Sequence, residues 1–156
     1  MRILALFMIC AALVIISESY LSGRRAAVRA AKRDAALVSA VSRGIKEGRG
    51  RLSDVLSSDC ADILGDPELY ALFFGTDGSL RDDIEKRIAE SCTVLMPNKA
   101  ALCDFFKSIR LGDETDKIRD EVCRGAEALA AEHERRERIC RTVCASFAAS
   151  LILLLI

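Results

Sequence analysis

Two uncharged apolar runs lie at opposite ends of the chain and limit what it can fold into. Residues 3–16 form the first run directly after Arg2, and residues 142–156 form the second, which ends in an unbroken series of Leu and Ile. A helix of about 15 residues is roughly 22 Å long, whereas the hydrocarbon core of a bilayer is about 30 Å thick. Each run is therefore short for a membrane span, and we expect neighbouring residues to extend it.

The first run gains the missing length if it continues to Leu21. It then reaches about 31 Å, with Glu18 and Tyr20 near the membrane interface, where a carboxylate is far less unfavourable than at the centre of the bilayer. A cleaved secretory signal is the alternative, because Arg2, a short apolar stretch and the small polar residues near Ser19 fit that pattern.

Positive charge flanks both runs on the side of the middle segment. These residues are Arg24, Arg25, Arg29, Lys32 and Arg33 after the first run, and Arg135, Arg136, Arg138 and Arg141 before the second. Cationic flanks are retained in the cytoplasm. We therefore predict transmembrane segments at residues 1–21 and 142–156 and a cytoplasmic helical domain at residues 22–141, with both termini outside.

The composition favours helices and gives no sign of nucleic-acid binding. Hydrophobic residues make up 51% of the 156 residues, but only 5% are aromatic and Trp is absent. A profile rich in Ala, Leu, Arg and Glu suits helices and not strands. The 23 Lys and Arg balance 23 Asp and Glu, so no net field attracts nucleic acid. We predict an all-α chain, an antiparallel helical bundle whose two long helices continue into the membrane segments.

The middle segment shows helical spacing between turn signals. Its first amphipathic series is Val28, Ala31, Ala35, Val38, Val41 and Ile45. Shorter helices are predicted at residues 54–64, 68–74, 79–95 and 100–111, and the longest pattern, residues 116–141, runs into the second apolar run without a break. Asp66 is expected as an N-cap with Pro67 at the first helical position, and residues 79–82 resemble a capping box.

The sequence contains no motif that predicts a catalytic residue, a bound cofactor or a metal site. The glycines around Gly48 do not form a phosphate-binding loop, and the single histidine, His133, lies near an apolar seam where a packed side chain is expected. The seven cysteines are odd in number and lack a C-x-x-C spacing, so we interpret them as small buried apolar side chains in a reducing compartment. Cys140 and Cys144, one turn apart, are the pair best placed for another role.

An acidic loop before the longest helix suggests a docking surface for a soluble partner. Helix capping by Asp or Thr is its ordinary explanation. The alternative is a partner-binding site at the distal end of the bundle, formed by Arg110, Asp113, Glu114, Asp116 and Lys117. On that hypothesis, charge reversal at Asp113 and Glu114 weakens partner capture and leaves folding intact.

The order of these elements, together with three short motifs, resembles the stage III sporulation protein AB family, whose soluble part is similar to type II secretion F platform proteins. The motifs are Ile45 with Gly48 and then Leu52; Leu111-Gly112 with Asp116 before a long helix; and Arg138-Ile139-Cys140-Arg141 leading into the terminal apolar tail. The chain departs from the family pattern at Gly44, Arg119 and Cys144, where the family has an acidic residue, a glutamine and a glycine.

The resemblance implies a non-catalytic membrane scaffold in the mother-cell membrane of an endospore-forming bacterium, part of the channel apparatus that joins mother cell and forespore. It implies a cytoplasmic secretion-type ATPase, similar to stage III sporulation protein AA, as a partner, together with other membrane proteins of the same complex. Two alternatives stay open: a membrane-anchored adaptor or regulatory helical module, and a secreted enzyme with a cleaved signal.

Overall fold

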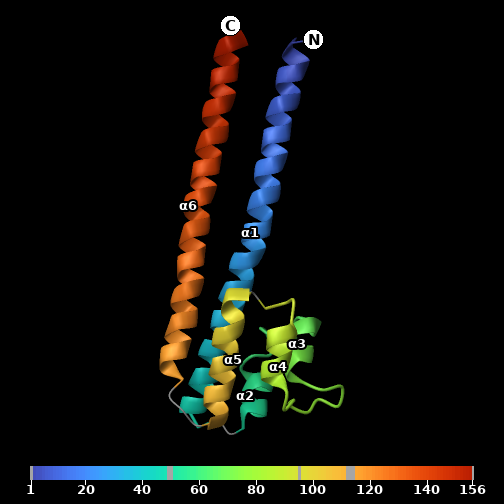
Figure 1. Cartoon of the computed structure of the whole chain (residues 1–156), viewed down its shortest axis with the longest axis vertical. Helices are drawn as coiled ribbons and strands as arrows, with labels where there is room; N and C mark the ends of the chain where they lie inside the picture. The colour runs from blue at the N-terminus through green and yellow to red at the C-terminus, as the bar shows by residue number, and fades with distance from the viewer. Residues whose placement is uncertain (1, 49–50, 95, 112–114, 156) are drawn as a thin grey trace. The chain divides into compact units, whose positions relative to one another are not determined.

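The computed structural model of the chain describes residues 2–48, 51–94, 96–111 and 115–155. These residues form helices α1 (Arg2–Lys46), α2 (Leu52–Ser58), α3 (Pro67–Phe73), α4 (Ile84–Glu90), α5 (Met96–Leu111) and α6 (Asp116–Leu155) (Figure 1). An isolated antiparallel bridge pairs Phe74 with Leu80. The described residues form helices and no β-strand beyond this single bridge, so the all-α prediction is confirmed.

The chain divides into two compact units. Unit 1 contains Met1–Val28 and Ala128–Ile156, and unit 2 contains Arg29–Glu127. Helices α1 and α6 contribute to both units because each is continuous across the division. The predicted continuity of the two long helical patterns with the terminal apolar runs is thus confirmed. Unit 2 is smaller than the predicted domain at residues 22–141, since both ends of that segment belong to unit 1.

Unit 1 is a pair of helices that run side by side, with both chain termini at one end of the pair (Figure 1). Leu21 is buried against the partner helix at 2% exposure. An ion pair joins the helices, because Arg25 Nη2 donates to Glu137 Oε1 at 3.1 Å. No stretch of helix within the described residues is both long enough and apolar enough to cross a membrane.

Unit 2 has an apolar core to which every helix of the unit contributes. Its larger members are Leu37, Val38, Val41, Leu56, Leu69, Phe73, Ile84, Ile88, Leu102, Phe105, Phe106 and Val122. The rings of Phe105 and Phe106 meet edge to face with centroids 5.5 Å apart. Burial of each such side chain contributes about 1.5–3 kcal/mol. This burial holds α2, α3 and α4 in place, since helices of 7 residues are not stable alone.

The start of α3 follows the predicted capping pattern. Asp66 lies at the N-cap and its Oδ1 accepts a hydrogen bond from the Glu68 amide at 3.0 Å. Pro67 occupies the first helical position, where its missing N–H has no bond to lose. This local prediction is confirmed because it depends only on neighbouring residues.

The prediction that a capping box at residues 79–82 opens the fourth helix is wrong. The Asp77 carboxylate accepts hydrogen bonds from the Ser79 amide at 3.1 Å and from its hydroxyl at 2.7 Å, so Ser79 belongs to a turn. Gly78, with φ of 75°, supplies the left-handed residue in that turn. Helix α4 consequently begins at Ile84, and it ends at Glu90 instead of residue 95.

Two other helix boundaries differ from the prediction. Helix α2 ends at Ser58 instead of residue 64, and the hydroxyls of Ser57 and Ser58 donate to the Asp54 carbonyl at 3.1 and 2.7 Å, which competes with helical pairing. Helix α5 begins at Met96, so Pro97 lies in its first turn, where proline is tolerated, and does not break the helix.

Burial corrects two further expectations. Ile45, expected on the apolar face of the first helix, is 41% exposed. Among the cysteines only Cys60 is fully buried, whereas Cys92 is exposed and the other five are partly exposed. Burial raises the pKa of the Cys60 thiol to about 11. The interpretation of the cysteines as buried apolar side chains therefore holds for Cys60 and is wrong for Cys92.

Candidate functional site

Of the predicted docking residues, Asp116 begins α6. Its Oδ2 accepts a hydrogen bond from Lys46 Nζ at 2.7 Å, and its Oδ1 accepts one from Arg119 Nη1 at 2.9 Å. The bond from Lys46 lowers the pKa of Asp116 below its usual value. Asp116 therefore joins the last turn of α1 to the first turn of α6. Lys117 is exposed beside it.

Arg110, in the last turn of α5, contacts a different part of unit 2. Its Nη2 donates to the Asp82 carbonyl at 2.8 Å and lies 3.5 Å from Glu85 Oε2. No hydrogen bond or ion pair between Arg110 and Asp116 occurs among the described residues. The described residues of the predicted site, Arg110, Asp116 and Lys117, thus do not form a single cluster. Asp113 and Glu114 lie outside the described residues.

Arg110 instead lies at the rim of a small groove, which we call the α4–α5 groove. The groove has a volume of about 220 Å³, with an apolar floor formed by Leu52, Leu80, Ile84, Phe106 and Ile109. Arg81, Asp82 and Glu85 complete its rim with Arg110. The arrangement suits an apolar side chain flanked by polar groups, which is the pattern of a peptide-binding site.

Among the residues that line this groove, Arg110 belongs to the docking residues predicted from the sequence, and the others do not. The heptad-like spacing of apolar residues on α5 places Phe106 and Ile109 on one face, and this was visible in the sequence. The segment that lines the groove beside this face, residues 80–85, is predicted to be helical throughout, but α4 begins only at Ile84. The missing signal was the turn at Asp77, which redirects the chain before α4.

Unit 2 contains a buried charged cluster that the sequence analysis does not predict. The Asp34 side chain is 1% exposed, accepts a hydrogen bond at Oδ2 from Asn98 Nδ2 at 3.1 Å, and lies 3.5 Å from Arg33 Nη2. Arg33 also donates to the Thr93 carbonyl at 3.0 Å and contacts Asp66 at 3.4 Å. The cluster thereby connects α1 with the start of α3 and of α5.

The Asp34 carboxylate is incompletely satisfied in this cluster. Burial raises its pKa above the usual value, against the opposing effects of the Asn98 hydrogen bond and the Arg33 charge. Neither its Oδ1 nor Arg33 Nε has a hydrogen-bond partner among the described residues. A signal for this residue existed in the sequence, since position 34 lies three residues after Ala31 and four before Val38, on the apolar stripe.

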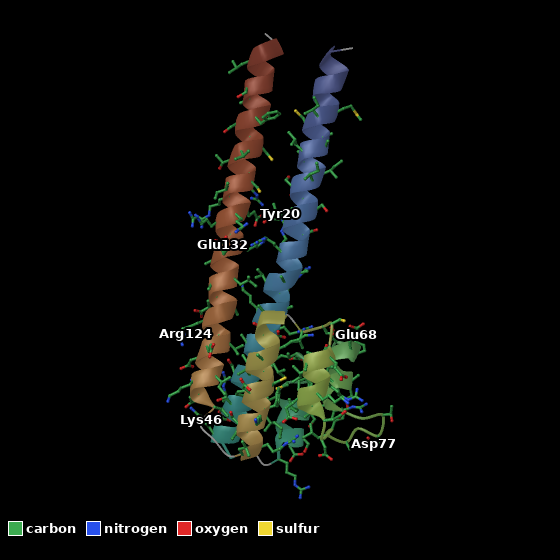
Figure 2. The ribbon with its side chains drawn as sticks, viewed as in Figure 1. Tyr20, Lys46, Glu68, Asp77, Arg124 and Glu132 are labelled. Atoms are coloured by element: carbon green, nitrogen blue, oxygen red, sulfur yellow. The ribbon has the colours of Figure 1, made fainter. Side chains whose placement is uncertain are left out.

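In unit 1, polar side chains from both helices meet near Tyr20 and Glu132, which lie beside one another (Figure 2). Arg136 Nη1 donates to the Tyr20 hydroxyl at 3.0 Å and its Nε donates to Glu132. The Arg24 guanidinium lies 5.5 Å from the centroid of the Tyr20 ring. Arg136 lowers the pKa of Glu132, so this carboxylate is ionised at neutral pH.

His133 is packed into unit 1 at 7% exposure. Its Nε2 lies 3.8 Å from Glu137 Oε2, and its Nδ1 has no hydrogen-bond partner in the part of the chain that the structure describes. Glu137 also accepts a hydrogen bond from Arg141 at 2.6 Å, in addition to that from Arg25. The imidazole is therefore part of the interhelical packing, as a packed side chain on an apolar seam is expected to be.

Neither a protein-family model, nor a curated protein, nor a solved structure matches this chain.

Proposed function

We propose that the chain is a non-catalytic, membrane-anchored scaffold in which the paired helices of unit 1 enter the bilayer and unit 2 docks a cytoplasmic ATPase of the secretion type. The resemblance to the stage III sporulation protein AB family suggests the place, a sporulation channel complex in the mother-cell membrane. The anchor is supported by the surface of unit 1, and the docking site by the α4–α5 groove.

The observation that carries the proposal is apolar exposure on every side of α1 in unit 1. The successive residues Leu13, Val14, Ile15 and Ile16 are 40%, 52%, 68% and 65% exposed. At about 3.6 residues per turn, four successive residues point to all sides of a helix. Val143 and Phe147 of α6 are exposed as well. An apolar surface of this kind is favourable only when lipid or a partner covers it.

The polar residues of unit 1 support lipid as the covering material. Tyr20, with its ring against Arg24, lies where the exposed apolar residues give way to ion pairs. Tyr and Arg are characteristic of the level at which a bilayer meets water. The ion pair between Arg25 and Glu137 lies on the water side of this level along both helices.

The test uses the full-length chain reconstituted in phosphatidylcholine vesicles. The protein should float with the vesicles and stay with them through an alkaline carbonate wash. Ile15→Asp should reduce retention, because a carboxylate within the apolar layer costs about 2.5–3.5 kcal/mol. Ile45→Asp is the matched control, since Ile45 is an exposed isoleucine of α1 in unit 2 and its substitution should leave retention unchanged. Equal loss in both variants would contradict the anchor.

The same vesicles test docking. A purified secretion-type ATPase encoded beside this chain should float only when the chain is present, and Arg110→Glu should weaken its recovery. Lys107→Glu, the same charge change at an exposed position of α5 outside the groove, should not. Recovery that is the same in the two variants would remove the groove from the docking site.

The second candidate function is a membrane-anchored adaptor, and the small volume of the α4–α5 groove favours it. A cavity of about 220 Å³ accepts one or two apolar side chains and not a large surface. The adaptor is favoured if a short peptide floats with the vesicles and the ATPase does not. Arg110→Glu should then reduce recovery of the peptide.

A further inference from the structure

Unit 1 contains two adjoining cavities between its helices. The first, of about 450 Å³, has a mixed lining in which Glu132, Arg135 and Arg136 supply the charged groups. The second, of about 620 Å³, has a mainly apolar lining that includes Ile9, Leu13, Ile16, Val143 and Phe147. Tyr20, Ile139 and Cys140 line both. The two cavities therefore form one groove, the hairpin groove, which is polar at one end and apolar at the other.

The polar end carries an excess of positive charge. Two arginines, Arg135 and Arg136, line this cavity together with one carboxylate, Glu132, which is paired with Arg136. The charges of Arg135 and Arg24 also lower the pKa of Glu132. The Arg135 side chain is exposed and has no hydrogen bond or ion pair with another described residue. Since guanidinium stays charged at every physiological pH and matches the geometry of phosphate, this end attracts a phosphate group.

The apolar end has the length of one bilayer leaflet. From Tyr20 to Ile9, α1 advances by about 16 Å at about 1.5 Å per residue. Half of the hydrocarbon core is about 15 Å. The volume of this end lies within the range of about 300–1,000 Å³ that is usual for small-molecule sites. An acyl chain that starts at the level of Tyr20 and points into the bilayer fits these dimensions.

We infer that the hairpin groove binds one anionic phospholipid of the surrounding bilayer, with its phosphate beside Arg135 and Arg136 and one acyl chain along the apolar end. This inference rests on the proposed membrane anchor. A soluble phosphate would leave the apolar end uncovered, and a zwitterionic lipid would leave the excess positive charge without a counterion.

The chain contains no tryptophan, so a single introduced indole can report on the lipid beside it. The full-length chain with Phe147→Trp is reconstituted in phosphatidylcholine vesicles that contain a minor fraction of phosphatidylglycerol. Bromine on the acyl chains of one lipid or the other quenches indole fluorescence on contact. The control is Ile15→Trp, at a residue that is 68% exposed and does not line the groove.

With Phe147→Trp, quenching by brominated phosphatidylglycerol should exceed its share of the lipid, whereas with Ile15→Trp it should follow the bulk composition. Addition of Arg135→Gln should lower the preference about tenfold, because a charge-assisted hydrogen bond to the lipid phosphate is lost. Addition of Arg138→Gln should leave it unchanged, because that side chain is 81% exposed and lies outside the groove.

The outcomes separate this inference from the anchor. Protein that fails to float with vesicles of either composition refutes the anchor, and with it the lipid site. Protein that floats, but is quenched equally by both brominated lipids with Phe147→Trp, refutes the lipid site alone. A preference that survives Arg135→Gln together with Arg136→Gln also refutes it, since bulk charge would then be the cause. The lipid site is also refuted if Ile15→Trp shows the same preference for brominated phosphatidylglycerol as Phe147→Trp.

Discussion

At the scale of single residues, Asp34 has the environment least expected from its type. A carboxylate usually lies at the surface, but this one is 1% exposed within α1 and depends on Asn98 and Arg33 for compensation. Such a group stabilises a fold when it is neutral and opposes folding when it ionises without full pairing. Asp34 therefore makes the stability of unit 2 depend on pH.

The sign of that dependence follows from the raised pKa of Asp34. Its contribution to stability is fully present below the unfolded value of 3.8 and is lost as the pH rises through the higher folded-state value. In Asp34→Asn, which cannot ionise, this fall in the free energy of unfolding should disappear. Urea denaturation at a series of pH values from below 3.8 to neutral measures the free energy of unfolding of both proteins. Asp104→Asn, at an exposed position on α5, is the control and should keep the wild-type slope.

At the scale of elements, Gly44 permits the close approach of α1 to α2. A Cβ atom at this position would meet the Val55 side chain, with Cγ2 at 2.9 Å and Cγ1 closer still. Val55 is 1% exposed, so its methyl groups have no free space into which to move. The sequence places Gly44 near the end of a helix, where a turn signal is the obvious explanation. The structure shows that Gly44 instead leaves room for the Val55 side chain.

Gly44→Ala should lower the free energy of unfolding by about 1–3 kcal/mol, because overpacking outweighs the gain of about 0.5–1 kcal/mol in helix propensity. The matched control is Gly125→Ala in α6, where an added Cβ has nothing within 4 Å, and this variant should be slightly stabilised. Denaturant melts of the two variants provide the comparison. Restoration of stability to Gly44→Ala by Val55→Ala would identify the contact, and additive losses would contradict it.

At the scale of the whole molecule, the proposed anchor means that unit 2 lies on one side of the membrane. The basic residues that follow and precede the apolar runs predict the cytoplasmic side. The cysteines of the chain can report on this, because Cys92 is exposed in unit 2 and Cys60 is buried there. The pKa of Cys60, raised to about 11, also keeps its thiol protonated and unreactive.

A variant that retains only Cys92 should resist a membrane-impermeant maleimide in intact cells and react once the membrane is opened. A variant that retains only Cys60 should react in neither case and become labelled only in denaturant, which controls for unfolding. Mass spectrometry of the recovered protein gives the labelled fraction. Ready labelling of Cys92 in intact cells would reverse the orientation and exclude docking of a cytoplasmic ATPase.

The helical class, the two long helices and the N-cap at Asp66 could be predicted from the amino-acid sequence, because periodicity and capping depend on residues within one or two turns. The turn at Asp77 is local, but its hydrogen bonds to Ser79 compete with the capping pattern that residues 79–82 also fit. The burial of Asp34 and the α4–α5 groove could not be predicted from local patterns. In both cases the contact joins residues far apart in sequence, as between Asp34 and Asn98 or between Arg110 and Asp82. A local pattern contains no information about such a neighbour, since burial is set by what packs against a residue and not by the residue alone.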